Sequence, residues 1–293
     1  MGQIGSRDLE LVLALVRGRT LAEGARRLQV DTSTVFRAIQ RLEKELRQTL
    51  FERRRDGMVP NELALELARR GEAVEAQVEQ ARELLNADDR PMAGLLRITT
   101  TDTILKGLLL PVLPVFVQAH PQVELELVAT NQVASLSRRD ADIAIRPSMK
   151  PPEHLVGAKL GRIASALWAS QAYLDANPSY RIPAQMDWAA PDDSLAEHPS
   201  AKWRRSKFPG VVPRFRCNSI LSIADLVEHG QAIGVAPAFL LQARPGIVNL
   251  SGAVDDLGVD LWALTHPDVR HLRRVKAFFD FLRTSIRLDD ATA

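Results

Sequence analysis

The sequence has a single cysteine, Cys217, among its 293 residues. One cysteine forms neither a disulfide within the chain nor a thiolate metal cluster, so nothing in the sequence depends on an oxidising compartment. Aromatic residues make up 5% of the chain and charged residues 25%, with a formal net charge of +2. This composition excludes a disulfide-stabilised secreted scaffold, a disordered chain and an acidic tail protein.

Long hydrophobic runs are also missing. The longest apolar run, residues 107–117, contains two prolines, whereas a membrane-spanning helix needs about 20 apolar residues. Asp8 and Glu10 interrupt the apolar residues that begin at Leu9, which a secretory leader does not tolerate. We therefore expect a cytoplasmic protein that has no membrane partner.

The common catalytic and phosphate-binding motifs are absent as well. The sequence has no Gly-x-Ser-x-Gly, no P-loop, no Gly-x-Gly-x-x-Gly and no His-Glu-x-x-His. His266 and His271 have no further clustered ligand, which favours a surface loop over a metal site. In Pro-Asp-Asp-Ser, Asp192 and Asp193 are more typical of a turn than of a catalytic pair. We predict no enzyme, no cofactor and no metal.

Charge is distributed unevenly along the chain. Residues 1–60 hold twelve Lys and Arg against eight Asp and Glu, whereas residues 61–90 hold four against eight. A basic N-terminal block suits a polyanionic partner, although many proteins with such a surface never bind nucleic acid. A motif is needed to decide between these alternatives.

The basic block has the pattern of a helix-turn-helix. Ser6 is a plausible N-cap for a first helix that Gly18 stops, and Thr20 with Glu23 forms a capping box that starts a second helix. Asp31 is placed to cap a third helix. The third helix carries its apolar stripe at Val35, Ile39, Leu42 and Leu46.

The outer face of the third helix and a following hairpin are candidates for DNA contact. Small hydroxyl side chains at a helix N-terminus can reach bases or phosphates, and residues 50–60 predict a basic hairpin, or wing, with an Asp-Gly turn. A polar outer face is also typical of any amphipathic helix. The predicted DNA-binding residues are Thr32, Ser33, Thr34, Arg37, Arg41, Arg53, Arg54 and Arg55.

A heptad pattern follows the wing. Apolar residues at alternating steps of four and three form a seam suited to pairing two helices. Gly71 on this seam either permits close backbone approach or weakens it, and residues 86–94 are polar, then Pro- and Gly-bearing, as in a hinge. The predicted dimerisation residues are Leu67, Val74, Val78 and Leu85.

From residue 95 onward, strands alternate with helices. The pattern predicts strands at 95–100, 123–128, 141–145, 165–169 and 234–236, and helices at 104–118, 220–228, 237–242 and 272–287. This alternation is typical of parallel α/β units.

The chain resembles the LysR-type transcriptional regulators. The residues that carry the resemblance lie at 21–28, 33–46, 50–53, 96–98, 114–116, 120–123, 140–146 and 230–237. Two departures stand out: Phe36 occupies a position that is often serine, and Pro60 with Asn61 replaces the usual residues after the wing. Phe36 is expected to alter base contacts.

The resemblance implies an α+β chain in three parts. These are a winged helix-turn-helix (1–60), a dimerisation linker helix with a hinge (61–90), and a periplasmic-binding-protein-like effector domain (91–293). The last comprises two α/β subdomains, about 91–162 plus 267–293, and 163–266. Together with the seam, it implies a homodimer or homotetramer on an inverted-repeat operator in double-stranded DNA, and RNA polymerase is a candidate partner.

The expected function is sequence-specific transcription regulation, modulated by a small-molecule effector. The predicted effector residues lie at strand-to-helix junctions: Thr101, Asp102, Thr103, Thr130, Asn131, Asn218 and Ser219. Helix N-termini favour anions, but Asp102 favours a cationic or hydroxylated ligand, and each residue taken alone is also explained as a helix cap. Cys217 beside them is either a redox sensor or a structural thiol. The alternative function is a DNA-binding protein whose α/β half serves only oligomerisation.

Overall fold

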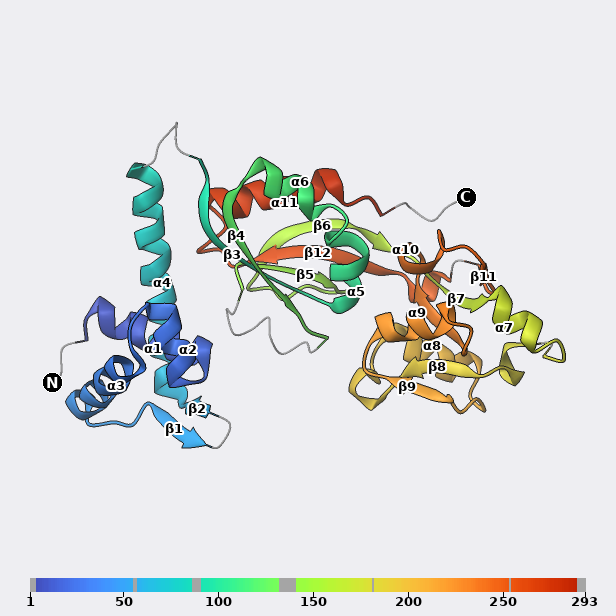
Figure 1. The fold of residues 1–293 in the computed structure, drawn as a ribbon, viewed down its shortest axis with the longest axis horizontal. Helices are drawn as coiled ribbons and strands as arrows, with labels where there is room; N and C mark the ends of the chain where they lie inside the picture. Colours follow the sequence, from blue (N-terminus) through green and yellow to red (C-terminus); the bar gives the residue numbers. More distant parts are fainter. Residues whose placement is uncertain are drawn as a thin grey trace. The chain divides into compact units, whose positions relative to one another are not determined.

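The computed structural model describes residues 4–54, 57–85, 91–131, 141–180, 182–252 and 254–288. The chain divides into two compact units, Met1–Arg90 and Pro91–Ala293. Figure 1 shows the helices and strands of each unit, coloured along the sequence.

The first unit is a three-helix core with a hairpin and a long helix. Its elements are α1 (Ser6–Gly18), α2 (Leu21–Leu28), α3 (Thr32–Leu46), β1 (Phe51–Arg54), β2 (Gly57–Pro60) and α4 (Glu62–Leu85). The two strands pair antiparallel, with Phe51 opposite Pro60 and Arg54 opposite Gly57. The predicted winged helix-turn-helix is confirmed. The stripe of Val35, Ile39 and Leu42 is buried in its core.

The ends of the first two helices differ in detail from the predictions. Gly5, not Ser6, is the N-cap of α1, because its backbone is extended and the helix starts at Ser6; the Asp8 carboxylate accepts the Gly5 N–H at 3.0 Å. The helix continues through Gly18 and ends at Arg19, which adopts a left-handed conformation with φ 58°. Gly18 has a different role: a Cβ there would lie 2.8 Å from the backbone nitrogen of Gly24 on α2.

The capping box of α2 is half formed. The Thr20 hydroxyl accepts the Glu23 N–H at 3.1 Å, as predicted. The Glu23 carboxylate instead contacts the guanidinium groups of Arg26 and Arg27. Asp31 occupies the N-cap position of α3, but its side chain makes no capping hydrogen bond.

The second unit contains two five-stranded sheets. The first has the order β4-β3-β5-β12-β6 and the second β11-β7-β10-β8-β9. The strands are β3 (Ala93–Thr100), β4 (Gln122–Ala129), β5 (Ile143–Pro147), β6 (Val156–Ile163), β7 (Ser165–Ser170), β8 (Trp188–Pro191), β9 (Phe215–Cys217), β10 (Ile233–Pro237), β11 (Ile247–Asn249) and β12 (Val259–Thr265).

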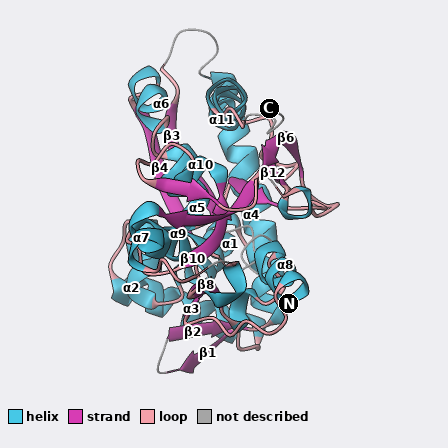
Figure 2. Cartoon of the chain, turned by 90° about the vertical axis from the view of Figure 1, so that its right-hand side faces the viewer, coloured by secondary structure: helices cyan, strands magenta, loops and turns pink. Residues whose placement is uncertain are grey.

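Helices and short turns connect these strands. They are α5 (Asp102–Ile104), the π-helical turn η1 (Leu105–Leu109), α6 (Leu113–Ala119), α7 (Gln171–Ala176), η3 (Pro183–Gln185), η4 (Asp193–Leu195), α8 (Pro199–Lys207), α9 (Ile220–Glu228), α10 (Ala238–Leu241), η5 (Asp255–Leu257) and α11 (Arg273–Ser285). Figure 2 shows how these helices surround the strands of the unit. The predicted α/β class is confirmed.

The sheets are mixed rather than wholly parallel. Strands β4 and β5 flank β3 in parallel, as predicted, but β12 runs antiparallel to both β5 and β6. In the second sheet, β10 is parallel to β8 and antiparallel to β7. Strand β12 belongs to the first sheet, whereas the expected subdomain boundary placed residues 259–265 with the second.

The helix predicted at 104–118 is broken. It begins as α5, continues as η1, and resumes as α6 with a bend of 68°. Proline has no N–H to donate and its ring clashes with the preceding turn, so Pro111 and Pro114 interrupt the helix and start its second part. Together with α11, α6 covers one face of the first sheet (Figure 1).

Side-chain alternation divides the second sheet into two faces. Ala166 and Trp168 of β7 pack into the cluster formed with α9 and α10, whereas Leu167 and Ala169 pack into the cluster with Tyr173 of α7. This period of two is expected of a strand that is covered on both sides.

Among the helices in the described part of the chain, none alone is long and apolar enough to span a membrane. The bent pair Asp102–Leu109 and Leu113–Ala119 meets that criterion jointly, by length and composition.

Candidate DNA-binding surface and effector site

The N-terminal end of α3 presents its polar side chains to solvent. Thr32, Ser33, Thr34 and Arg37 are all exposed, while Val35 between them is buried. The Arg37 side chain folds back so that its Nε donates to the Ser33 carbonyl oxygen at 3.2 Å. The first two turns of this helix therefore offer hydroxyl and guanidinium donors to solvent.

Arg41 is also exposed, by 59%, but it is tied to another helix. Its Nη2 lies 2.7 Å from Oδ1 of Asp8 on α1, and its Nε lies 3.7 Å from Glu45. Because a neighbouring carboxylate already compensates its charge, Arg41 is less available to a phosphate than Arg37.

The two described wing arginines lie in different surroundings. The guanidinium of Arg53 lies over the ring of Phe36 on α3, with Cζ 4.6 Å from the ring centroid. Arg54 instead pairs with Glu52 at 2.9 Å. Arg55, the third predicted wing residue, lies outside the described residues.

Glu43 fixes the start of the wing. Its Oε1 accepts the backbone N–H groups of Leu50 at 2.7 Å and of Phe51 at 3.2 Å. A charged residue on an amphipathic helix has no sequence signal for such a role, and sequence reasoning missed it. The contact attaches the first strand of the hairpin to α3.

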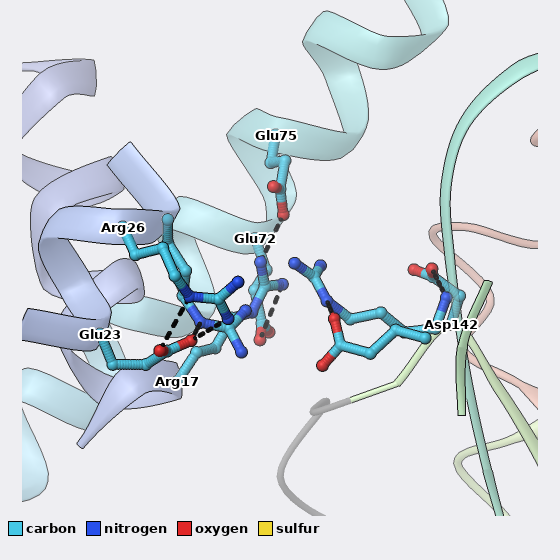
Figure 3. A network of polar contacts seen from close by, with 9 residues as sticks. Arg17, Glu23, Arg26, Glu72, Glu75 and Asp142 are labelled. Atoms are coloured by element: carbon cyan, nitrogen blue, oxygen red, sulfur yellow. Dashed lines mark hydrogen bonds and ion pairs between the residues drawn. The ribbon is translucent and has the colours of Figure 1, made fainter. Parts of the chain in front are cut away.

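The long helix α4 is held to the three-helix core by charge and by close packing. Arg17 of α1 lies 2.9 Å from Glu75 and 3.6 Å from Glu72 (Figure 3). A Cβ at Gly71 would lie 2.8 Å from the carbonyl oxygen of Leu9. Of the two explanations for Gly71, close approach is therefore the one the structure supports, and the neighbour is α1 of the same chain.

The predicted dimerisation seam has one part that is covered and one that is exposed. Leu67 packs partly against the three-helix core, Val74 is half-buried, and Val78 is 43% exposed. The side chain of Leu85 lies outside the described part of the structure. Of the predicted seam residues whose side chains the structure describes, Val78 is the one that is exposed.

The predicted effector residues meet at the junction of the two sheets. Oδ2 of Asp102, which follows β3, accepts the Ser219 hydroxyl at 2.6 Å and the Asn131 Nδ2 at 3.0 Å. Asn131 Nδ2 also donates to the Asn218 carbonyl oxygen at 3.2 Å. We call Asp102, Asn131, Asn218 and Ser219 the junction network.

Local hydrogen bonds hold the junction network in place. Oδ1 of Asp102 accepts both the N–H and the hydroxyl of Thr103, at 2.6 and 3.1 Å. The Thr101 hydroxyl caps α5 by accepting the Ile104 N–H at 3.3 Å, and the Ser219 oxygen caps α9 by accepting the Ser222 N–H at 3.1 Å. Thr101 and Ser219 thus act as helix caps, and Asp102, Thr103, Asn131, Asn218 and Ser219 lie together. The Thr130 carbonyl oxygen instead accepts from Arg146.

A buried arginine supports the same region. Arg146 on β5 is 6% exposed, and its Nη1 donates to the Thr130 carbonyl oxygen, while Nη2 donates to the Thr99 hydroxyl at 2.8 Å. Burial lowers the pKa of Arg146 to about 10. In the sequence Arg146 stands out only as part of a family motif, since an arginine inside a strand does not by itself indicate where its side chain ends.

A separate pocket of about 180 Å³ lies beside η1, α9 and α10. Phe239, Leu240, Lys106 and Asp225 are among its lining residues, and none of the predicted effector residues lines it. Lys106 and Asp225 form an ion pair of 3.4 Å across it.

The remaining candidate groups have structural explanations. Burial and the nearby Asp192 carboxylate raise the pKa of the Cys217 thiol, which disfavours the reactive thiolate. The Asp192 side chain accepts the Ser194 N–H at 2.9 Å, as expected of a turn. His266 pairs with Asp268 at 3.0 Å.

Two protein-family models match the chain. The model of the LysR substrate binding domain matches residues 89–287. The model of the bacterial regulatory helix-turn-helix proteins of the lysR family matches residues 6–65.

Curated relatives are transcription regulators. The Mau operon transcriptional activator of Paracoccus denitrificans is 27% identical over 263 residues, which cover 90% of each chain. The transcriptional activator IlvY of Salmonella typhimurium is 34% identical over 255 residues, which cover 82% of this chain and 84% of that protein.

Solved structures share the fold. Full-length OxyR from Pseudomonas aeruginosa has a TM-score of 0.71 at 15% identity, covering 97% of this chain and 96% of that one. LysG from Corynebacterium glutamicum, solved with bound effector Arg, has a TM-score of 0.64 at 17% identity, covering 97% and 100%.

Proposed function

The chain belongs to the LysR family of transcriptional regulators, and from this premise we propose that the exposed end of α3 and the wing bind a specific DNA sequence. The observation that carries the proposal is that α3 buries an apolar stripe in the core and exposes a group of hydrogen-bond donors, Thr32, Ser33, Thr34 and Arg37. A helix of this kind lies in the major groove, and its N-terminal side chains contact base edges.

The assignment is tested by comparing two arginines. Arg37→Ala removes a base-facing donor, so specific affinity should fall by about 1 to 3 kcal/mol. Arg54→Ala removes a wing charge that Glu52 partly compensates, so binding should weaken on all sequences and the salt slope should fall by up to about one. The measurement is a gel-shift titration at two salt concentrations on the best duplex selected from a random library. If both variants match the parent, this surface is not the DNA-binding face.

The junction of the two sheets is the proposed effector site. Its support is the convergence of Thr101, Asp102 and Thr103 with the Asn131 and Ser219 side chains, since ligands of open α/β sheets gather at strand carboxyl ends. LysG carries a bound arginine in a similar fold. A ligand that binds only the folded state raises the thermal midpoint, so a thermal-shift screen of amines, amino acids and carboxylates tests the site.

One observation favours the alternative in which the α/β half serves only oligomerisation. The donors of the junction network already bind the Asp102 carboxylate of the same chain. A screen in which no compound raises the midpoint, together with an intact oligomer by light scattering, favours this alternative.

Assembly as a homodimer is part of the proposal. It is supported by the exposed side chain of Val78 on α4 and by the symmetry that paired recognition helices impose on an operator. The expected footprint is an inverted repeat with half-sites about one helical turn, or a multiple of it, apart. A footprint on an asymmetric single site would contradict the dimer.

A further inference from the structure

Phe36 is an aromatic residue on the polar side of the recognition helix. It is half-buried, and its ring lies under the guanidinium of Arg53, 4.6 Å from centroid to Cζ. A cation within about 6 Å of an aromatic face is attracted by the ring quadrupole. The contact therefore links α3 to the wing through one side chain from each.

The same side of α3 holds the wing at a second point. Glu43 lies seven residues, about two turns, after Phe36, and its carboxylate accepts the N–H groups of Leu50 and Phe51. The N-terminal end of β1 is thus bound to Glu43 of α3, and near its other end Arg53 contacts Phe36 of α3. Two contacts, one polar and one aromatic, fix the direction of β1 along the helix.

Arg53 and Arg54 are therefore not equivalent. Successive strand residues point to opposite sides, and accordingly Arg54 turns to the Glu52 carboxylate at 2.9 Å while Arg53 turns to the helix. The Arg53 Cζ lies over the Phe36 ring, 4.6 Å from its centroid. The N–H donors of a guanidinium lie in its plane and an aromatic ring takes up none of them as a conventional acceptor, so the contact with Phe36 leaves Arg53 donors for bonding to DNA.

We propose that Phe36 is a positioning residue that holds Arg53 beside the exposed donors of α3, so that Arg53 contributes to sequence-specific binding. Arg54, which the ring does not hold, contributes to binding on any sequence. The inference rests on the proposed function in DNA binding. It assigns a role to the departure from the family pattern at position 36.

The test is a double-mutant cycle on the full-length protein. The probes are the best duplex that the parent selects from a random library and a duplex of scrambled sequence. F36L removes the ring quadrupole and keeps an apolar side chain, so affinity for the selected duplex should fall by about three- to ten-fold. Affinity for the scrambled duplex should stay the same, and F36Y, which keeps the ring, should stay within about twofold of the parent.

Coupling separates positioning from a general structural effect. With the ring gone, Arg53 is no longer held, so F36L/R53A should bind no worse than R53A alone. R54A is the matched control: the fold-loss of affinity of F36L/R54A should equal the product of the fold-losses of F36L and R54A. R53K should bind the selected duplex more weakly than the parent, and this difference should shrink in the F36L background.

Three results overturn the inference. The first is a double variant F36L/R53A whose loss of affinity for the selected duplex is the product of the two single losses. The second is an F36L variant that loses as much affinity for the scrambled duplex as for the selected one. The third is an F36Y variant that binds the selected duplex as weakly as F36L. A parent protein that enriches no sequence from the library overturns the proposed function, and the inference with it. If the parent selects a sequence but the effects of F36L and R53A on affinity are independent, only the inference is overturned.

Discussion

The Asp102 carboxylate accepts the Ser219 hydroxyl at 2.6 Å, and the two residues are 117 positions apart in the sequence. Asp102 follows the first sheet's strand β3, and Ser219 begins α9 against the second sheet. One side chain of the protein thus occupies the position between two helix starts that would otherwise suit an external anion.

The charge of Asp102 is predicted to select the ligand. Amines should raise the thermal midpoint of the parent more than carboxylates of similar size. A carboxylate ligand is repelled by the Asp102 carboxylate, and the Asn131 and Ser219 donors already bond to Asp102. Asp102→Asn should reverse this order, since it removes the charge and keeps the size. Ser219→Ala is the control that keeps the charge and should keep the order. Equal responses to both classes in the parent would remove Asp102 as the determinant.

Arg41 is predicted to contribute less to DNA binding than Arg37, because Asp8 already compensates its charge at 2.7 Å. Arg41→Ala should lower specific affinity by under about 1 kcal/mol, below the range expected of a base-contacting arginine. Asp8→Asn releases Arg41 and should steepen the salt slope by up to about one. Titrations at several salt concentrations measure both effects, and an Arg41→Ala loss larger than that of Arg37→Ala would reverse the assignment.

Val78 and Gly71 on α4 are predicted to affect different properties. Val78→Asp replaces an exposed apolar side chain of the proposed seam with a charge, so it should dissociate the proposed dimer while the thermal midpoint of the monomer stays near that of the parent. Gly71→Ala adds a Cβ 2.8 Å from the Leu9 carbonyl oxygen, which should cost about 1 to 3 kcal/mol of folding stability. Light scattering and urea unfolding separate the two. A dimeric Val78→Asp variant would exclude this part of the seam.

His198 is predicted to make stability depend on pH. Burial lowers its pKa from 6.5 to about 4. Between these values the unfolded chain binds a proton that the folded chain does not, so stability falls as the pH falls from 6.5 to 4, by up to about 3 kcal/mol. Above pH 6.5 both states are neutral and the effect is absent.

The matched variant for this effect is His198→Asn. Asparagine is a favoured N-cap, and the native ring accepts the Ser200 N–H at 3.3 Å at the start of α8. In urea unfolding from pH 6.5 to 4, the unfolding free energy of the parent should fall by up to about 3 kcal/mol more than that of the variant. Parallel curves would show that His198 does not titrate as described.

The helix-turn-helix was predictable because its signals are local. The stripe of Val35, Ile39 and Leu42 and the Thr20 cap each involve residues within one or two turns. Apolar periodicity also located α9, whose bounds match the prediction.

The departures arise where a distant partner decides the structure. Strand β12 was not predicted, and its place in the first sheet depends on distant partners, because it pairs with β5 on one side and β6 on the other. The effector residues were predicted to share a site, but nothing local indicated that Asp102 itself bonds Ser219 and Asn131. The contact between Phe36 and Arg53 could not be predicted either, since the sequence pattern places each of them on the surface and does not show that they meet.

The pairing of β5 with β12 also sets the order in which the chain can be assembled during synthesis. Ile143 pairs with Thr265 and Pro147 with Leu261, while all strands of the second sheet lie between, at 165–249. The second sheet can therefore close on the ribosome before β12 joins the first sheet. Until β12 emerges, β5 is an open edge that can pair with another chain. Nascent chains stalled before residue 259 should be the form most prone to aggregate.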